Sequence, residues 1–130
     1  MFRYKILYTR KVAVIKNIDW RGSSLKDLRD FPTDVKKRAG YELEQIQHGL
    51  PPTQWKSIND WGSGVVEIKL DTFAGAFRVV YIAKFEDAIY ILHCFAKKTQ
   101  QTSLTDIAII KARYAEIVRK RQRRENERKD

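Results

Sequence analysis

Residues 65–95 have the sequence VVEIKLDTFAGAFRVVYIAKFEDAIYILHCF, and this stretch decides the fold. It contains three runs rich in β-branched and aromatic residues, over residues 65–70, 77–83 and 89–95, and the first two alternate with a period of two. That period is typical of strands with one buried face. A turn through residues 71–75 separates the first two runs, and Glu86-Asp87 marks a tight turn before the third. Strands joined in this way predict an antiparallel meander.

Helices are predicted before and after this meander. Apolar residues recur at helical spacing from Ser23 to Pro32 and again from Thr33 to Gly49, which predicts an N-terminal helical hairpin. A third helix follows the meander. It begins at the capping box Ser103-x-x-Asp106 and carries an apolar stripe as far as Val118.

We expect the chain to form one α+β domain, residues 1–130, in which the helices cover one face of a small antiparallel sheet. Two strand-like clusters, residues 4–8 and 12–15, make residues 1–17 an N-terminal extension or an extra strand. Residues 119–130 contain no apolar residue, so we expect a charged C-terminal tail that frays into solvent.

The chain is strongly basic, with a formal net charge of +10 and 32% charged residues. This excess favours polyanionic partners, such as nucleic acid, the ribosome, an acidic protein or an anionic membrane surface. Cys94 is the single cysteine, and without a secretory signal pattern we expect a cytoplasmic protein. The longest apolar runs are well short of the ~20 residues of a membrane span. One Cys and two His do not make a structural zinc site, so we predict no metal and no cofactor.

A cluster of basic groups with one carboxylate is predicted on the sheet face opposite the helices. If the apolar positions of the first two strands face the core, Glu67 and Lys69 face outward and Arg78 lies beside them. Lys97 and Lys98 follow the third strand. Such a cluster suits RNA cleavage without a metal, because RNA supplies its own 2′-hydroxyl nucleophile and Arg and Lys stabilise the phosphorane. Glu67 or one of the lysines could act as the base.

The same side chains also have ordinary structural interpretations. Glu67 and Arg78 could form a surface ion pair worth roughly 0–1 kcal/mol, and the lysine pair at 97–98 could belong to a solvated loop. His93 is better explained as a satisfied, half-buried histidine than as a catalytic group. The three tryptophans could stack on bases, but in a small domain they pack more often in the core or at its rim.

Six segments occur in an order that is informative as a set: Asp19–Leu28, Phe31-Pro32, Gly64–Lys69, Ala76–Tyr81, Ile89–Thr99 and Thr102–Arg113. Together they resemble the RelE/ParE toxin superfamily of type II toxin–antitoxin systems, and within it the phage-derived, HigB-like branch. The resemblance spans about residues 18–118. It implies a compact antiparallel sheet with an N-terminal helical hairpin and a C-terminal helix.

For function, the resemblance implies a metal-independent endoribonuclease that cleaves mRNA in the ribosomal decoding site and thereby inhibits translation. It implies an antitoxin partner, a helix-turn-helix protein from the adjacent gene. The basic sheet residues of the family fall here on Lys69 and Arg78, with Glu67 adjacent, and its basic residue after the last strand falls on Lys97 or Lys98.

The corner before the last helix departs from those relatives. Some members place a Tyr or His there that assists catalysis, but this chain has neither between Phe95 and Tyr114. Thr99, Gln100 and Thr102 stand there instead, and none of them is a good base. The residues predicted to contact RNA are Lys69, Arg78, Lys97, Lys98, Gln100 and Thr102.

Two other functions stay open at this point. A ParE-like gyrase poison would share the fold without the RNA chemistry, and a non-enzymatic RNA-binding protein would use the same basic surface. The presence of Lys69, Arg78 and the lysine pair at 97–98 favours the RNA-directed toxin. We expect the ribosome, mRNA and the cognate antitoxin as partners, with no membrane and no small-molecule cofactor.

Overall fold

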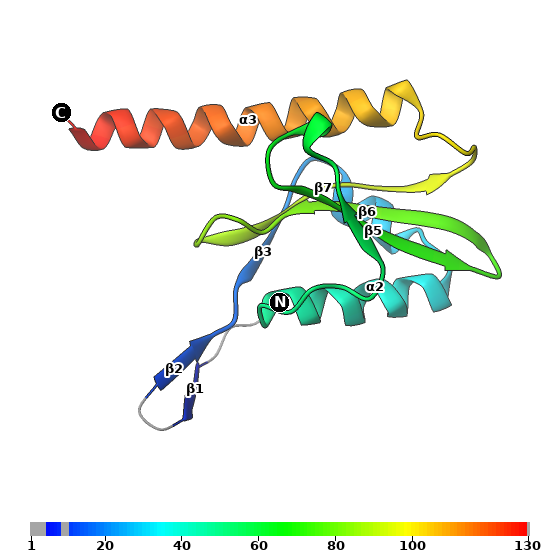
Figure 1. The fold of residues 1–130 in the computed structure, drawn as a ribbon, viewed down its shortest axis with the longest axis horizontal. Coiled ribbons are helices and arrows are strands. Elements are labelled where there is room, and N and C mark those ends of the chain that lie inside the picture. Colours follow the sequence, from blue (N-terminus) through cyan, green and yellow to red (C-terminus); the bar gives the residue numbers. More distant parts are fainter. Residues whose placement is uncertain (1–4, 9–10, 130) are drawn as a thin grey trace.

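A computed structural model describes residues 5–8 and 11–129, with side chains described from residue 15 to residue 129 (Figure 1). The predicted meander is confirmed. Its strands are β5 (Val65–Thr72), β6 (Gly75–Ile82) and β7 (Ala88–Lys97), which pair antiparallel in sequence order. Lys69 lies opposite Arg78 in this register.

Two further strands complete a five-stranded sheet of order β3-β7-β6-β5-β4. β4 (Trp55–Ser57) pairs antiparallel with β5 at one edge. β3 (Asn17–Trp20) pairs with β7 at the other edge and runs parallel to it, so the prediction of a purely antiparallel sheet is wrong. A parallel pair needs a long crossover connection. The chain between β3 and β7 provides one, since it passes through two α-helices and three strands.

The N-terminal residues form a separate two-stranded antiparallel sheet, made of β1 (Lys5–Tyr8) and β2 (Lys11–Val14). Both strand-like clusters of the sequence therefore contain a strand. Tyr4, at the start of the first cluster, lies outside the described residues. The β1–β2 pair projects away from the five-stranded sheet (Figure 1).

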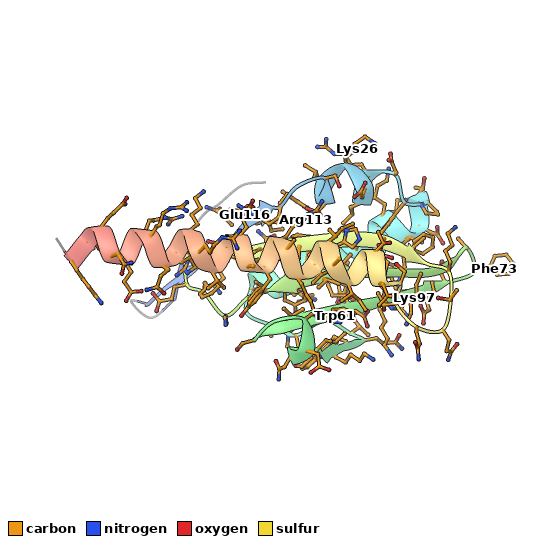
Figure 2. All side chains as sticks on the ribbon, turned by 90° about the horizontal axis from the view of Figure 1, so that it is seen from above. Lys26, Trp61, Phe73, Lys97, Arg113 and Glu116 are labelled. Atoms are coloured by element: carbon orange, nitrogen blue, oxygen red, sulfur yellow. The ribbon has the colours of Figure 1, made fainter. Side chains whose placement is uncertain are left out.

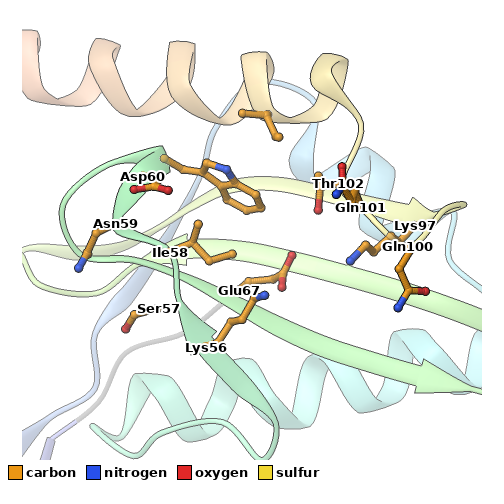
Figure 3. A pocket seen from close by; sticks show the side chains of 12 residues that line it. Lys56, Ser57, Ile58, Asn59, Asp60, Glu67, Lys97, Gln100, Gln101 and Thr102 are labelled. Carbon is orange, nitrogen blue, oxygen red and sulfur yellow. The ribbon is translucent and has the colours of Figure 1, made fainter.

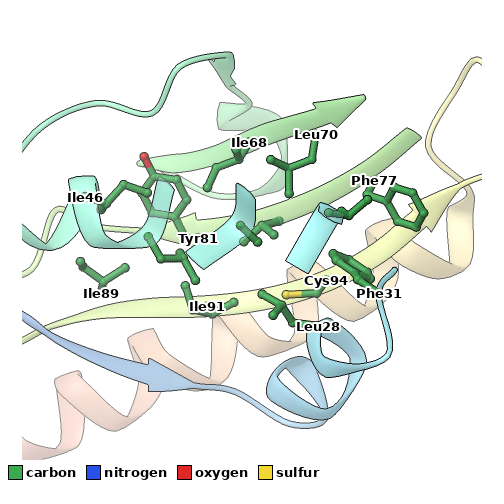
Figure 4. Packing of buried hydrophobic residues seen from close by; sticks show 14 residues of the cluster. Leu28, Phe31, Ile46, Ile68, Leu70, Phe77, Tyr81, Ile89, Ile91 and Cys94 are labelled. Atoms are coloured by element: carbon green, nitrogen blue, oxygen red, sulfur yellow. The ribbon is translucent and has the colours of Figure 1, made fainter. Parts of the chain in front are cut away.

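α1 (Ser24–Arg29) and α2 (Thr33–Gln47) cover one face of the five-stranded sheet (Figure 1). Their apolar side chains pack against inward-facing residues of β5, β6 and β7 (Figure 4). This first cluster consists of Leu28, Phe31, Val35, Ala39, Leu43, Ile46, Ile68, Leu70, Phe77, Val79, Tyr81, Ile89, Ile91 and Cys94. α1 has only six residues, so α2 is the one long helix on this face, and the predicted helical hairpin is not established.

α3 (Leu104–Lys129) crosses the opposite face of the sheet (Figure 1). Its Ile110 and Ile117 belong to a second buried cluster with Val65, Val80, Ile82, Ala88, Tyr90, Leu92 and Phe95. The prediction that all helices lie on one face is therefore wrong. The physical reason lies in β7, which is apolar on both of its sides and needs a cover on each.

Residues 119–129 continue α3 to its end at Lys129, so the predicted charged tail is helical in the structure. Arg, Lys, Gln and Glu fill most of this segment, and all four are good helix formers. Within the described part of the chain, none of the helices combines the length and the apolar character that a membrane span requires.

Candidate functional site

A cleft of about 580 Å³ opens on the α3 face of the sheet, near the N-terminus of α3 (Figure 3). β4 and the short 3-10 helix η1 (Asn59–Trp61) build one wall, and β5 provides the floor. The end of β7 and the loop before α3 build the opposite wall. The lining residues are Lys56, Ser57, Ile58, Asn59, Asp60, Trp61, Glu67, Lys97, Gln100, Gln101, Thr102 and Ile107.

Glu67 forms the floor of the cleft, and its carboxylate points into it (Figure 3). Its side chain is only 2% exposed. One carboxylate oxygen, Oε2, lies 3.9 Å from Nε of Arg78. The other, Oε1, has no hydrogen-bond partner among the described residues. Oε1 is itself buried from solvent, and burial of an incompletely paired carboxylate is costly. The carboxylate therefore meets a ligand in the cleft through Oε2.

Arg78 lies beside Glu67 and is held by the protein itself. Its side chain is 7% exposed, and its Nη1 lies 2.6 Å from Oδ1 of Asp71. The same nitrogen donates a hydrogen bond of 2.9 Å to the carbonyl oxygen of Phe77. Glu67 and Arg78 are thus neighbours, as predicted, but they form a buried pair. The prediction of an exposed surface is wrong because α3 packs on the sheet face that was expected to be open.

Two lysines line the cleft from opposite walls. Lys56 stands directly across from Glu67 in the β4–β5 register, and Lys97 lies at the end of β7. Lys69 and Lys98, which the sequence groups with them, are not among the lining residues. Lys69 pairs with Arg78 further along β5, and Lys98 is exposed after β7.

The loop between β7 and α3 brings Gln100 and Thr102 to the wall of the cleft. Both are predicted RNA contacts, so the structure places them beside Glu67 and Lys97. Thr99 has a local role, because its Oγ1 donates a hydrogen bond of 2.7 Å to the carbonyl oxygen of Gln101. That bond closes the loop into a turn.

The sequence did not single out Lys56 or the pair Asn59-Asp60 as site residues, and Trp61 was interpreted as core or rim packing rather than as a residue that stacks on bases. No motif marks them, and only the pairing of β4 with β5 brings them next to Glu67. Trp61 is half-buried, packs against the second cluster and also lines the cleft, so it is a rim residue with one face accessible to a ligand.

A chain of polar contacts fixes the start of α3 over the sheet. Nε2 of His93 lies 2.7 Å from Oδ1 of Asp106, and the Ser103 hydroxyl donates a bond of 2.7 Å to Oδ2 of the same carboxylate. The backbone N–H of Asp106 donates to Oγ of Ser103 at 3.1 Å, as the predicted capping box requires. His93 is buried and does not line the cleft, and its Nδ1 has no partner among the described residues.

The cleft therefore combines an unpaired carboxylate oxygen with two ammonium groups. These groups suit a substrate that carries both a negative charge and a proton to give up. Cys94 takes no part, since it lies in the first cluster on the other face of the sheet. Burial there raises the pKa of its thiol, with a further contribution from the charge of Asp27, and so disfavours a thiolate nucleophile.

A comparison with curated proteins found no match. A family model described as "Phage derived protein Gp49-like (DUF891)" matches residues 26–115, which is well over half of the chain. The matched stretch runs from α1 into α3 and includes every residue that lines the cleft. The chain therefore belongs to the phage-derived Gp49-like family, a toxin family of type II toxin–antitoxin systems with RelE-like character.

Proposed function

We propose that this protein is the toxin of a type II toxin–antitoxin system and cleaves mRNA on the ribosome without a metal. The observation that carries the proposal is the Glu67 carboxylate, which is buried at the floor of the cleft, has no hydrogen-bond partner for Oε1 among the described residues, and has a lysine on either side. Membership of a toxin family supports the biological role, and the net charge of +10 supports an RNA target.

In the proposed reaction, Glu67 is the general base. Its carboxylate takes the proton of the 2′-hydroxyl through Oε2, and the resulting oxygen nucleophile attacks the adjacent phosphorus. The bond from phosphorus to the 5′-oxygen breaks, Lys97 gives a proton to that oxygen, and the products are a 2′,3′-cyclic phosphate and a 5′-hydroxyl end. Lys56 stabilises the charge on the non-bridging oxygens of the phosphorane.

Arg78 has a positioning role in this proposal. Its Nε lies 3.9 Å from Oε2 of Glu67, and its Nη1 is held by Asp71 and a backbone carbonyl. With a side chain only 7% exposed, Arg78 is poorly placed to bind phosphate. Its charge offsets part of the cost of burying the Glu67 carboxylate. The two side chains therefore act together although only Glu67 touches the substrate.

Dependence on the ribosome follows from what the cleft lacks among its described residues. It has no histidine or tyrosine that could supplement the base, and its walls are a three-residue strand, a short turn of helix and a loop. Another molecule must then align the 2′-hydroxyl with the scissile bond. The decoding site of the ribosome can hold mRNA in such a geometry. The HigB-like assignment, with an antitoxin from the adjacent gene, belongs to the same proposal.

Induction of this chain in a bacterial host, with and without the neighbouring gene, followed by mapping of mRNA 5′ ends, tests the proposal. We expect new ends inside translated frames that disappear when translation initiation is blocked, and rescue of growth by the neighbouring gene. Growth arrest with intact mRNA would transfer the proposal to a gyrase poison. Absence of arrest would favour a binding protein without enzymatic activity.

A further inference from the structure

Packing against the rest of the fold does not account for the composition of the distal half of α3. Ile117 is the last buried residue of the helix, and the helix continues for more than three further turns to Lys129. Figure 1 shows this end extending beyond the five-stranded sheet. It also lies beyond residue 115, where the match to the Gp49-like family ends.

Residues 119–129 contain seven basic and two acidic residues and none that is apolar. Among the basic residues, Arg121 is held by the fold. It forms an ion pair of 2.9 Å with Asp87, and its guanidinium carbon lies 3.9 Å from the centre of the Phe85 ring. Burial acts to raise the pKa of Asp87, but the hydrogen bonds from Tyr90 and Arg121 and the charge of Arg121 bring that pKa below its ordinary value.

Four other cations form what we call the basic stripe: Arg119, Lys120, Arg123 and Arg124. All four are exposed, and within residues 15–129 none of them forms an ion pair. They stand as two pairs at the i, i+4 spacing, which places like charges next to each other on the helix surface. Repulsion of this kind destabilises a helix. Attraction to Glu116 offsets part of it, since the hydrogen bond and charge of Arg21 lower the pKa of Glu116 and the charges of Arg119 and Lys120 lower it further.

The basic stripe borders a concavity of about 480 Å³ between α3 and the segment after β3. Arg21 lines it from that segment and forms an ion pair of 2.8 Å with Glu116. Figure 2 shows Glu116 and Trp61 on opposite sides of α3, so the concavity and the cleft do not share a wall. Thirteen residues separate Ile107 in the cleft from Lys120, about 20 Å along the helix axis at 1.5 Å per residue.

We propose that the basic stripe is a second RNA-binding surface, which holds phosphates of structured RNA away from the scissile bond. A protein partner would need apolar anchors at the centre of its interface, and this segment offers none. Interfaces with nucleic acid are polar, wet and strongly positive. Three of the four residues are arginines, whose planar fork fits phosphate oxygens. The inference rests on the proposed function, since a nuclease working on the ribosome is surrounded by structured RNA.

The test is binding of a short RNA duplex that contains no cleavage site, measured by fluorescence anisotropy at salt concentrations between about 50 and 200 mM. The full chain with Glu67→Gln avoids cleavage. The stripe variant combines Arg119→Gln, Lys120→Gln, Arg123→Gln and Arg124→Gln with Glu67→Gln. The matched control carries Lys26→Gln, Arg29→Gln, Lys36→Gln and Lys37→Gln, which removes the same charge from exposed or half-exposed positions of α1 and α2.

We expect the stripe variant to lower the magnitude of the slope of log Kobs against log [salt] by about 3.6, from four lost phosphate contacts at about 0.9 each, while the control changes it little. Equal losses in the two variants would show binding by net charge alone and overturn the inference. So would unchanged RNA affinity with lost binding of the neighbouring gene's product, which would make the stripe a protein interface. Circular dichroism checks that α3 stays helical in both variants.

The proposed function and this inference fail in different ways. If mRNA is never cleaved in cells but duplex binding depends on the stripe, the proposed function is wrong and the RNA-binding surface stands. If cleavage is normal and duplex binding does not depend on the stripe, the second surface is wrong and the proposed function stands.

Discussion

The two faces of the five-stranded sheet are built by the same strands but are covered differently. On one face, α2 lies against β5, β6 and β7, and the cluster beneath it is apolar. On the other face, α3 covers only part of the sheet, and beside its N-terminus the cleft leaves Glu67 as the floor. Adjacent residues of one strand show the contrast, because Ile68 is buried under α2 while Glu67 points into the cleft.

This difference shows how a small domain can hold an unpaired carboxylate. The α2 face supplies stability through apolar burial, and the α3 face carries a charged group whose burial is only partly compensated by Arg78. Burial of such a group is destabilising, so it can persist only where the rest of the fold is stable enough. We therefore expect substitutions of the charged residues in the cleft to change activity and those of the apolar residues under α2 to change stability.

The largest expected effect is on cleavage. Replacing Glu67 by Gln removes the base and should slow mRNA cleavage by about 10²–10⁴-fold while the protein stays folded. The matched control is Glu42→Gln on α2, another buried glutamate, whose Oε1 accepts a hydrogen bond of 2.9 Å from the backbone N–H of Thr53. An amide oxygen can accept that bond as well. Normal cleavage by the Glu67 variant, measured from mRNA 5′ ends, would remove Glu67 from the mechanism.

The next effect is on stability. Leu70 is fully buried under α2, so Leu70→Ala should lower the free energy of unfolding by about 2–5 kcal/mol. Ile107→Ala, in the half-open cleft, should cost only about 1 kcal/mol. Urea denaturation measures both. Equal losses at the two positions would mean that the two faces contribute alike to stability, which would contradict the difference between them.

A smaller effect is expected where α3 meets the sheet. Asp106→Ala removes the partner of His93 and the hydrogen bonds with Ser103, which should cost about 1–3 kcal/mol and loosen the first turn of α3. Amide hydrogen exchange in residues 103–110 should become faster, whereas the exposed neighbour Thr105→Ala should leave it unchanged. Unchanged protection in the Asp106 variant would show that Ile110 and Ile117 alone hold the helix in place.

The smallest effect appears only in alkali. Burial under α2, with the charge of Glu42 adding to it, raises the pKa of Tyr81 to about 12 from 10.0. The unfolded chain therefore loses the phenolic proton first, so stability is present below about pH 10 and is lost as the pH rises towards 12. Tyr81→Phe should reduce this decline in urea midpoints and change little at neutral pH. A decline of the same size in Tyr81→Phe would mean that other groups cause the loss of stability in alkali. The control is Tyr41→Phe, at an exposed tyrosine.

The sequence predicted the parts of the fold that depend on local pattern. The alternation in residues 65–82 gave β5 and β6 with Lys69 opposite Arg78, and helical spacing gave α2 and the capped start of α3. It predicted Glu67 and Lys97 beside each other at the site, and Gln100 and Thr102 near them. Each of these depends on residues close in sequence or joined by a short turn.

Other features depend on which elements meet in space. Lys56 joins the site only because β4 pairs with β5, and the parallel pairing of β3 with β7 has no local signal. The apolar runs of β7 can be satisfied by helices on one side or on both, so the pattern alone did not place α3.

By itself the sequence therefore determined the three strands of the meander, α2, the start of α3 and the positive charge, because period and composition are properties of neighbouring residues. Only the tertiary structure decided that Glu67 and Arg78 are buried. That outcome requires a helix from the other end of the chain to cover their face of the sheet, and burial is set by long-range packing.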